Sequence, residues 1–396
     1  MNSSGFIKRI ISIFYSSDEQ LFEVDAYKLP IAIGGAGKML ISNLHILKNE
    51  DYDTCLVLLG GVDRFNQKLE TIKVINVQLG ENKYNFNLLK SILNKPSLGV
   101  KELNQDDTVI FVYGRLILAF LIKLFNPRSK IYLFFASSFK GNIWAYGHKN
   151  ILIKIFFSTM CLFSLLLVDR IVVDKKDIIF FHPLMNSLKE KVFFLPNSVD
   201  MKIFNPSSNG KAFHINELKV EDRVLLYVGR LDDEISKNPE LLFRSFDLIS
   251  EKYENIKLVI VGVSHELFNK LIKNYNVKHA HNIINIGIVP NNSLPDYYRV
   301  AHLTLLTSNF EGTPFVVLES LACGTPCVVT DVLDKDLIKN GINGYVSYSK
   351  NADEFTDAIE KGLFLSKEIK DKKNSLLDRI YDQNYRKENL IELLKT

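Results

Sequence analysis

Leu303-Thr-Leu-Leu-Thr-Ser-Asn-Phe-Glu-Gly-Thr-Pro-Phe-Val-Val-Leu-Glu319 is the stretch that decides the fold of this chain. Its beginning, Leu303–Thr307, has the composition of a short buried strand, and a polar loop follows. Thr313 is a residue type that caps helices, and Pro314 suits the first helical position because its missing N–H would be unpaired there. A strand that leads through a short loop into a helix is the repeating unit of an α/β protein.

Two carboxylates lie eight residues apart in this stretch, with the helix start between them. Glu311 lies on the loop, and Glu319 lies on the helix, more than one turn in. The free N–H groups and the positive dipole end of the helix form a place for a phosphate between the two acids. Because carboxylates also accept hydrogen bonds from hydroxyls, the spacing predicts a site for a nucleotide sugar. Two solvated surface acids are the alternative, which the inserted Gly-Thr-Pro disfavours.

Strands and helices alternate along the whole chain, and this pattern predicts two parallel sheets. The predicted strands are Ile7–Tyr15, Thr54–Leu59, Lys73–Asn76, Thr108–Val112, Lys130–Ala136, Arg170–Val173, Val192–Leu195, Arg223–Val228, Lys257–Val261, Ile283–Ile286, Leu303–Thr307, Pro326–Thr330 and Gly344–Val346. The predicted helices are Gly37–Lys48, Asn85–Asn94, Leu116–Leu124, a stretch after Lys149, Asp174–Leu188, Pro239–Lys252, Asp353–Ser366 and Asn374–Leu394. The predicted fold class is α/β, with two doubly wound Rossmann-like domains that face a central cleft.

A length of 396 residues exceeds one ordinary core and predicts two domains. The join is expected between Leu195 and Pro206, where two prolines and a polar cluster interrupt both periodicities. We therefore expect an N-terminal acceptor-binding domain over 1–200 and a C-terminal donor-binding domain over 201–373. A last helix over 374–396 is expected to pack back on the first domain.

Two cations follow the predicted strand Arg223–Val228, on a loop at its carboxyl end. Gly229 allows close approach of the backbone, Arg230 offers a planar fork of donors, and Lys237 offers a point charge. Together these three residues suit a diphosphate. The alternative is that both cations pair with neighbouring acids, which are Asp232, Asp233 and Glu234.

A glycine-rich turn, Gly34-Gly-Ala-Gly-Lys38, opens a helix in the first half of the chain. Such turns expose backbone N–H groups to phosphate. Its spacing matches neither a dinucleotide fingerprint nor a Walker loop, so a plain tight turn is the alternative. The segment Phe194–Pro206 is a further candidate, and a hinge without ligand contacts is its alternative.

These residues, in this order, resemble the retaining glycosyltransferases of family 4, also called glycosyl transferases group 1, which have the GT-B fold. The resemblance is carried by Pro196–Pro206, Tyr227–Lys237, Leu258–Gly262, Asn285–Pro290 and Leu303–Val346. In the first half, only the glycine-rich turn and the order of the strands agree. The resemblance implies transfer of a hexose or N-acetylhexosamine from a nucleotide sugar, with a UDP-sugar favoured. It also implies retention at the anomeric carbon and no bound metal or other cofactor.

By the same resemblance, Glu311 contacts the donor sugar and stabilises the developing positive charge. Arg230 and Lys237 neutralise the leaving diphosphate, so these three residues are the expected catalytic residues. Glu319 binds the ribose. The other expected donor-binding residues are Gly34, Gly35, Gly229, Gly287, Val289, Gly312, Thr313, Pro314 and Phe315.

The chain departs from the family after the predicted strand Lys130–Ala136, where many members carry a His. Here the sequence continues as Ser137-Ser-Phe-Lys-Gly141, and the next His is His148. Either Ser137 or Ser138 fills that place on the acceptor side, or His148 folds back to it. The departure concerns the acceptor and leaves the prediction of donor binding intact.

A basic and apolar stretch, Thr108–Val168, contains no Asp or Glu. Cations set among large apolar side chains favour an anionic membrane surface, and a buried core with a few solvated lysines is the alternative. The apolar run Ile151–Val168 has 18 residues, the lower limit for a bilayer span, so a buried or interfacial helix is expected and a transmembrane helix is the alternative. The expected lipid contacts are Lys123, Lys140, Lys149 and Lys154. We therefore expect a cytoplasmic protein that lies peripherally on the inner face of the cell membrane.

The expected acceptor is a lipid-linked or membrane-anchored glycan, as in the synthesis of lipopolysaccharide, capsule or other surface polysaccharides and glycolipids.

Nucleic acid is not an expected partner. The net charge is +4, but the Lys and Arg residues are spread through apolar sequence and form no polar basic stripe. The four cysteines have no zinc-binding spacing and are expected to be reduced core residues. Two Asp-x-Asp matches, at Asp51 and Asp334, end no buried strand and are interpreted as solvated acids, so no metal site is expected.

Two other functions are compatible with these motifs. A sugar-nucleotide epimerase of the GT-B fold needs acid and base residues poised at the sugar, which seldom accompany this spacing of acids. An inactive subunit that binds a nucleotide sugar and scaffolds a polysaccharide complex is compatible with the missing His. A dinucleotide dehydrogenase is disfavoured, because no acidic residue ends a second strand about 20 positions after the glycine-rich turn.

Overall fold

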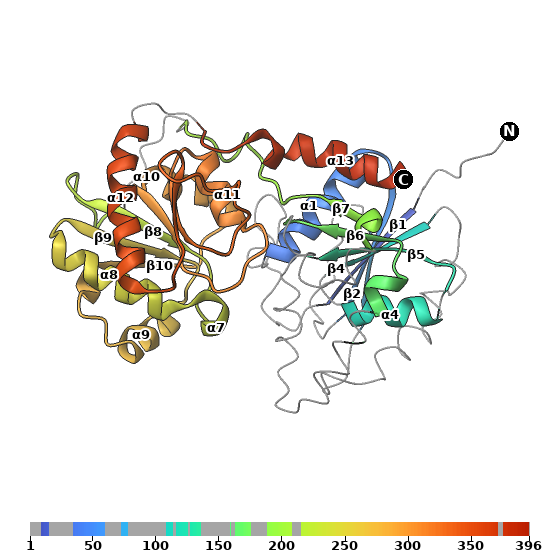
Figure 1. The fold of residues 1–396 in the computed structure, drawn as a ribbon, viewed down its shortest axis with the longest axis horizontal. Helices are drawn as coiled ribbons and strands as arrows, with labels where there is room; N and C mark the ends of the chain where they lie inside the picture. The colour runs from blue at the N-terminus through green and yellow to red at the C-terminus, as the bar shows by residue number, and fades with distance from the viewer. Residues whose placement is uncertain are drawn as a thin grey trace. The chain divides into compact units, whose positions relative to one another are not determined.

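A computed structural model describes residues 9–15, 35–59, 73–77, 108–113, 116–125, 127–135, 159, 163–175, 188–207, 215–370 and 375–395 of the chain. The chain forms two compact units. Unit 1 comprises Met1–Pro196 and Lys387–Thr396, and unit 2 comprises Asn197–Arg386. Each unit is built around its own parallel sheet (Figure 1).

The sheet of unit 1 has seven strands in the order β3-β2-β1-β4-β5-β6-β7. They are β1 (Arg9–Tyr15), β2 (Asp53–Leu59), β3 (Lys73–Val77), β4 (Thr108–Tyr113), β5 (Lys130–Phe135), β6 (Arg170–Val173) and β7 (Val192–Phe194). Helix α1 (Gly35–Asn49) connects β1 to β2, and α4 (Leu116–Phe125) connects β4 to β5. The strands extend to both sides of the first strand, which is the doubly wound arrangement.

The sheet of unit 2 has six strands in the order β10-β9-β8-β11-β12-β13. They are β8 (Arg223–Val228), β9 (Ile256–Val261), β10 (Ile283–Gly287), β11 (Leu303–Leu306), β12 (Cys327–Thr330) and β13 (Gly344–Ser347). The helices are α7 (Glu234–Lys237), α8 (Pro239–Lys252), α9 (His265–Asn274), α10 (Leu294–Val300), α11 (Phe315–Ala322) and α12 (Ala352–Lys370). The sheet again grows outward from its first strand, so unit 2 is also doubly wound.

Every predicted strand is present, with ends within two residues of the prediction. Helix α8 has the predicted bounds. The predicted helix Asn85–Asn94 and most of Asp174–Leu188 lie outside the described residues. Of the stretch predicted to be helical after Lys149, the structure describes a helical segment over residues 163–167.

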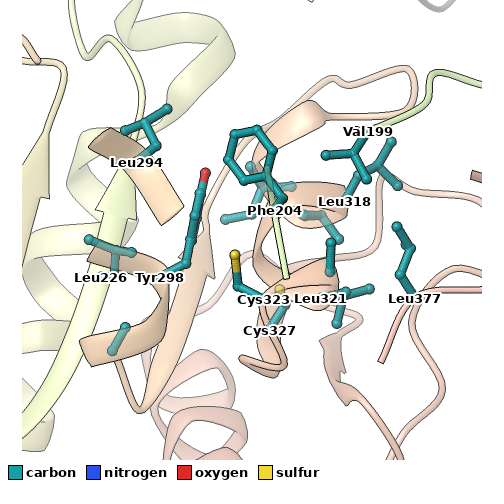
Figure 2. Packing of buried hydrophobic residues seen from close by; sticks show 14 of the residues in the cluster. Val199, Phe204, Leu226, Leu294, Tyr298, Leu318, Leu321, Cys323, Cys327 and Leu377 are labelled. Atoms are coloured by element: carbon teal, nitrogen blue, oxygen red, sulfur yellow. The ribbon is translucent and has the colours of Figure 1, made fainter. Parts of the chain in front are cut away.

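Two hydrophobic cores cover the two faces of the sheet in unit 2. Because strand side chains alternate between faces, Leu225 and Tyr227 of β8 enter the core formed with α8 and α12, whereas Leu226 enters the other. That other core packs α10 and α11 on the sheet and includes Tyr298 and Phe204 (Figure 2). Cys323 and Cys327 lie in it as free, buried thiols, which confirms the prediction for these two cysteines.

Three glycines with positive φ terminate neighbouring strands at the carboxyl edge of this sheet. They are Gly229 after β8 (φ 150°), Gly262 after β9 (φ 99°) and Gly287 in β10 (φ 86°). The N–H of Gly262 donates to the carbonyl of Gly287 at 2.8 Å. A Cβ on Gly262 would lie 3.0 Å from the carbonyl oxygen of Gly229, so only a glycine lets these two backbones approach so closely.

The predicted last helix begins too early in the sequence. The structure has helix α13 at Gln383–Lys395, preceded by a 3-10 turn over Arg379–Tyr381. Tyr381 is buried in the α10/α11 core, and its carbonyl accepts a hydrogen bond from the N–H of Val199 at 3.0 Å. This tertiary anchor keeps the chain out of the α-helical conformation up to Asp382, which is extended, and the helix starts after it. From Lys387 onward the helix belongs to unit 1, where Lys387 forms an ion pair with Glu50.

None of the helices in the described ranges is both long and apolar enough to cross a membrane.

Candidate active site

An ion pair joins two motifs that lie far apart in the sequence, the segment after β8 and the loop after β11. Lys237 Nζ lies 2.6 Å from Glu311 Oε1, across 74 residues of sequence. Ser308 Oγ donates to the same carboxylate oxygen at 2.7 Å. Both charged side chains keep some exposure, 29% for Lys237 and 14% for Glu311, so a ligand can reach them. The structure therefore concentrates one cation and one anion at the carboxyl edge of the sheet.

Backbone contacts hold the loop of Glu311 against the segment of Lys237. The N–H of Asn309 donates to the carbonyl of Ser236 at 2.7 Å, and the Asn309 side chain donates to the carbonyl of Ile235 at 2.7 Å. Thr307 Oγ1 donates to the carbonyl of Lys237 at 2.9 Å. Because all three bonds are accepted by backbone carbonyls of residues 235–237, the two charged side chains face each other on a fixed frame.

Lys237 owes its position to a change of direction between two helices. It is the last residue of α7, whose N-terminus is capped by Asp233 through a bond from the N–H of Ser236. Asn238 follows with φ 50°, which ends α7, and its side chain accepts a bond from the N–H of Leu241 to cap α8. Asn tolerates this left-handed conformation and is a preferred cap, so one residue ends one helix and begins the next.

Arg230 lies at the same edge but remains half exposed. Its Nε lies 3.8 Å from Asp232 Oδ1, which is a loose contact between exposed side chains. Pairing with a neighbouring acid, the alternative to a phosphate site, therefore applies to Arg230. It does not apply to Lys237, which pairs with the distant Glu311. The Tyr227 hydroxyl donates to the Arg230 carbonyl at 3.3 Å and supports this turn from within the core. Burial, with the charge of Glu311 next in importance, raises the pKa of Tyr227, so the hydroxyl stays a neutral donor.

Glu319 differs from Glu311 in its surroundings. It lies in the second turn of α11 and is 2% exposed. Tyr298 of α10 donates its hydroxyl to Glu319 Oε2 at 2.8 Å. Burial and then the neighbouring carboxylate raise the pKa of Tyr298 well above its ordinary value, so it donates throughout the physiological range. The ribose contact of Glu319 stays a prediction, whereas its bond to a core tyrosine is a feature that the sequence did not reveal.

Helix α11 begins one residue later than expected. Pro314 is extended (φ −73°, ψ 127°) and occupies the cap position, and the first helical residue is Phe315. The carbonyl of Pro314 accepts the first bonds of the helix, from the N–H groups of Val317 and Leu318 at 3.2 and 3.3 Å. The prediction that Thr313 caps the helix with Pro314 as first helical residue is therefore wrong. Gly312, Thr313 and Pro314 are buried, and Phe315 is partly exposed.

The predicted nucleobase residues lie at the end of β10. Gly287 is buried, and Val289 packs against the α10/α11 core. His265, the first residue of α9, places its Nε2 3.4 Å from where a Cβ of Gly287 would be, and its Nδ1 lies 3.3 Å from Asn285 Nδ2. The structure thus adds an imidazole and an amide to this part of the edge.

Several predicted residues lie outside the described part of the chain. These are Gly34, Ser137, Ser138, His148, Lys140, Lys149 and Lys154. Gly35 is the first residue of α1.

Lys123 does not fit its predicted role as a lipid contact. Its side chain is 14% exposed, and its Nζ lies 2.9 Å from Asp169 Oδ2. The same Nζ donates to the carbonyl of Ser129 at 2.6 Å. Asp169 also accepts the N–H of Ile131, so this ion pair braces the start of β5 and leaves no free ammonium for lipid.

Other contributors to the site have no recognisable sequence motif. Asn309 and Ser308 stand out only as polar residues that directly follow a strand. Lys350 donates to the carbonyl of Asn309 at 3.2 Å and lies over the ring of Phe310, with Nζ 5.5 Å from its centre. Burial lowers the pKa of Lys350. Within the ranges that the structure describes, no group of three or more His, Cys, Asp or Glu residues could hold a metal ion.

Comparisons with solved structures define the class of fold. The chain superposes on sucrose-phosphate synthase from Thermosynechococcus elongatus with a TM-score of 0.72 and 15% identity, covering 97% of this chain and 98% of that one. It superposes on the lipopolysaccharide outer core galactosyltransferase WaaB with a TM-score of 0.63 and 18% identity, covering 97% and 99%. The fold is GT-B.

Sequence comparisons find a family match in the second half of the chain. Residues 209–375 match the family model described as "Glycosyl transferases group 1". The chain is 27% identical to an uncharacterized glycosyltransferase of Haemophilus influenzae, over 83% of this chain and 86% of that protein. It is 30% identical to the UDP-Gal:alpha-D-GlcNAc-diphosphoundecaprenol alpha-1,3-galactosyltransferase of Escherichia coli, over 43% of this chain and 44% of that protein. Over residues 209–375, the chain is therefore similar to the group 1 glycosyltransferases.

Proposed function

We propose that this protein is a retaining, family 4 glycosyltransferase that moves a hexosyl or N-acetylhexosaminyl residue from a UDP-sugar to a lipid-linked or membrane-anchored glycan. The reaction would serve the synthesis of a surface polysaccharide or glycolipid on the cytoplasmic face of the cell membrane. The observation that carries the proposal is the pairing of Lys237 with Glu311 at the carboxyl edge of the sheet.

The pairing supports separate roles for Lys237 and Glu311 in binding the donor. A diphosphate that enters the site offers Lys237 a stronger anionic partner than one carboxylate, and Arg230 is exposed enough to join it. Glu311 is then released towards the sugar. During transfer, the bond between the anomeric carbon and the diphosphate breaks, the acceptor hydroxyl oxygen bonds to that carbon, and the proton of this hydroxyl passes to the departing diphosphate. The two cations stabilise the charge that grows on the leaving UDP, so the reaction needs no bound metal.

Two relatives support the choice of donor and acceptor. The E. coli relative is, by its name, a UDP-galactose transferase that acts on a diphosphoundecaprenol-linked sugar. A protein of the same fold, Alr3699/HepE from Anabaena, has been solved with UDP and with UDP-glucose. We extend both to this chain as a UDP-sugar donor and a lipid-linked acceptor.

Exposed apolar residues of unit 1 support membrane docking. Phe163, Leu166 and Leu167 are 50%, 42% and 41% exposed on one helical segment, while Leu165 of that segment is buried. Leu124 of α4 is 56% exposed. Large apolar side chains on one face of a short helix favour insertion at the boundary of headgroups and acyl chains. Among the described residues, these apolar side chains take the place of Lys123 as the proposed lipid contacts.

The proposal can be tested by measuring UDP release and sugar transfer from UDP-galactose, UDP-glucose and UDP-GlcNAc to lipid-diphosphate-linked sugars. Lys237→Ala and Glu311→Ala are expected to abolish transfer while circular dichroism and melting temperature stay near wild type. Lys252→Ala and Glu360→Ala are matched controls, because they break an ion pair of 3.1 Å elsewhere in unit 2. Wild-type turnover in both site variants would refute the assignment, and conversion of UDP-GlcNAc to an epimer would favour an epimerase.

A further inference from the structure

The first residue of unit 2 is bonded to the loop that carries Glu311. Asn197 Nδ2 donates to the carbonyl of Thr313 at 2.8 Å, across 116 residues of sequence. Both residues are buried, with exposures of 3% for Asn197 and 5% for Thr313. A hydrogen bond shielded from water in this way has a defined geometry and is costly to leave unmade.

The accepting carbonyl lies at the point where the loop turns into α11. The bonds of the helix start with the carbonyl of Pro314, so the Thr313 carbonyl precedes the helical ladder. Because a peptide group is planar, a donor fixed on this carbonyl sets the plane of the Thr313–Pro314 bond. The N–H of Thr313 lies in the adjacent peptide plane, which joins this one at the Cα of Thr313, so a fixed Thr313–Pro314 plane restricts the directions that this N–H can take.

The other end of the same loop is fixed by side chains. Lys237 and Ser308 both contact Glu311 Oε1, at 2.6 and 2.7 Å. Asn197 is therefore the anchor at the helix end, and Glu311 is the anchor at the strand end.

Asn197 itself is on a well-fixed segment of unit 2. Val199 is 3% exposed, its N–H donates to the carbonyl of Tyr381, and it pairs with Asp382 in a parallel β-bridge. The amide of Asn197 therefore projects from backbone that is tied down two residues later. Because its own backbone is fixed, the Asn197 side chain can determine the position of the loop that contains Thr313.

We propose that Asn197 is a positioning residue, which orients the backbone of the Glu311–Phe315 loop for the diphosphate of the donor. This inference rests on the proposed function, because it assumes that the loop binds a nucleotide sugar. Asn197 acts through the Thr313 carbonyl and makes no contact with the reacting atoms. A hinge without influence on the ligand is the competing interpretation of this segment.

The substitution Asn197→Asp separates the two interpretations. A carboxylate of the same shape would place a negative oxygen against the Thr313 carbonyl and push the loop away. Once protonated, the carboxyl group has an O–H that can donate to the carbonyl as the amide does. Burial raises the pKa of the introduced group, so the change is expected within an accessible pH range. UDP is a suitable probe, because its affinity is independent of the identity of the sugar.

We expect UDP binding, measured by calorimetry from pH 8 to pH 5, to be weakened at least tenfold at pH 8 in Asn197→Asp. The ratio of variant to wild-type affinity should rise towards one as the pH falls. Asn197→Leu has the same branched shape without a donor and should bind weakly at every pH. Ser198→Ala, a neighbouring buried position, should match wild type.

Other results would overturn the inference. If wild type binds UDP and the ratio for Asn197→Asp does not change with pH, Asn197 does not position the loop. If Asn197→Asp does not fold, Asn197→Leu decides: wild-type affinity in a folded Asn197→Leu refutes the proposal, and weakened affinity at an unchanged melting temperature supports it. If wild type itself binds neither UDP nor any UDP-sugar, the proposed function fails and this inference with it.

Discussion

Tyr298 donates its hydroxyl to the carboxylate of Glu319 at 2.8 Å, inside the core between α10 and α11. This bond keeps a buried acid in place at 2% exposure. It also couples the helix that follows the Glu311 loop to the helix before β11. The two acids of the motif are thus held by different means, one by a lysine at the surface and one by a tyrosine in the core.

Removing this hydroxyl should destabilise unit 2. Tyr298→Phe removes a hydrogen-bond donor from the buried Glu319 carboxylate, and the free energy of unfolding should fall by about 1–3 kcal/mol. Urea unfolding measures the loss. Tyr381→Phe is the control, because it removes a hydroxyl from a buried tyrosine of the same core and leaves Glu319 paired. Equal stability losses in the two variants would contradict the assigned role of the bond.

Asn238 should contribute through its cap and its backbone conformation together. Asn238→Ala removes the cap of α8 and forces a residue with a Cβ into φ 50°, so a loss of about 1–2 kcal/mol is expected. Asn238→Gly should cost less, because glycine accepts this conformation. Ser264→Ala, which removes only the cap of α9, is the matched control. A loss in Asn238→Ala no larger than in Ser264→Ala would show that the left-handed turn contributes nothing.

Gly262→Ala should disturb both stability and donor binding. The new Cβ would lie 3.0 Å from the carbonyl oxygen of Gly229 at a φ of 99°, and a strained residue of this kind costs about 1–3 kcal/mol. Because the displaced backbone leads to Arg230, UDP affinity should also fall. Gly341→Ala has a similar φ of 77° but meets only a tyrosine hydroxyl at 3.7 Å. It should lose less stability and keep its affinity, and the opposite ranking would refute the close-approach argument.

The buried thiols should make unfolding sensitive to alkaline pH. Burial, the largest cause, raises the pKa of both Cys323 and Cys327 from 9.0 to about 12. Their contribution is fully present below pH 9, where both states are protonated. It is lost as the pH rises from 9 towards 12, because only the unfolded state then releases the proton. Each thiol should lower the free energy of unfolding by about 1.4 kcal/mol per pH unit in that window.

Urea titrations between pH 7 and pH 10.5 check this slope against Cys323→Ala and Cys327→Ala. Each substitution lowers the free energy of unfolding at neutral pH, because it leaves a cavity. It should also remove the contribution of one thiol, about 1.4 kcal/mol per pH unit, from the fall of this free energy above pH 9. An unchanged slope in both variants would show that these thiols titrate normally in the folded protein.

The apolar anchors of unit 1 should mediate membrane binding. The double substitution Leu166→Gln and Leu167→Gln is expected to reduce binding to vesicles that contain phosphatidylglycerol by at least tenfold in co-sedimentation. Val220→Gln is the control, since it removes a fully exposed apolar side chain of unit 2. Unchanged vesicle binding in the double variant, together with a wild-type melting temperature, would disprove docking through residues 163–167.

Local patterns predicted the elements of this fold well. Apolar strands bounded by polar turns are decided over a few residues, so the thirteen strands and helix α8 could be located from the sequence. The last helix could not, because the helical pattern after Asn374 competes with the burial of Tyr381 and its contact with Val199. A contact over such a distance in sequence leaves no local signal.

Local sequence patterns were enough to locate the order of strands and helices, the loop of Glu311 before a helix, and the cations after β8. These depend on side-chain periodicity and turn chemistry, which act between neighbours in the chain. The partners of the functional residues depend on tertiary packing: Lys237 for Glu311, Tyr298 for Glu319, Asn197 for Thr313 and Asp169 for Lys123. Each pair is brought together by the order of strands in a sheet, and that order depends on the packing of the whole unit.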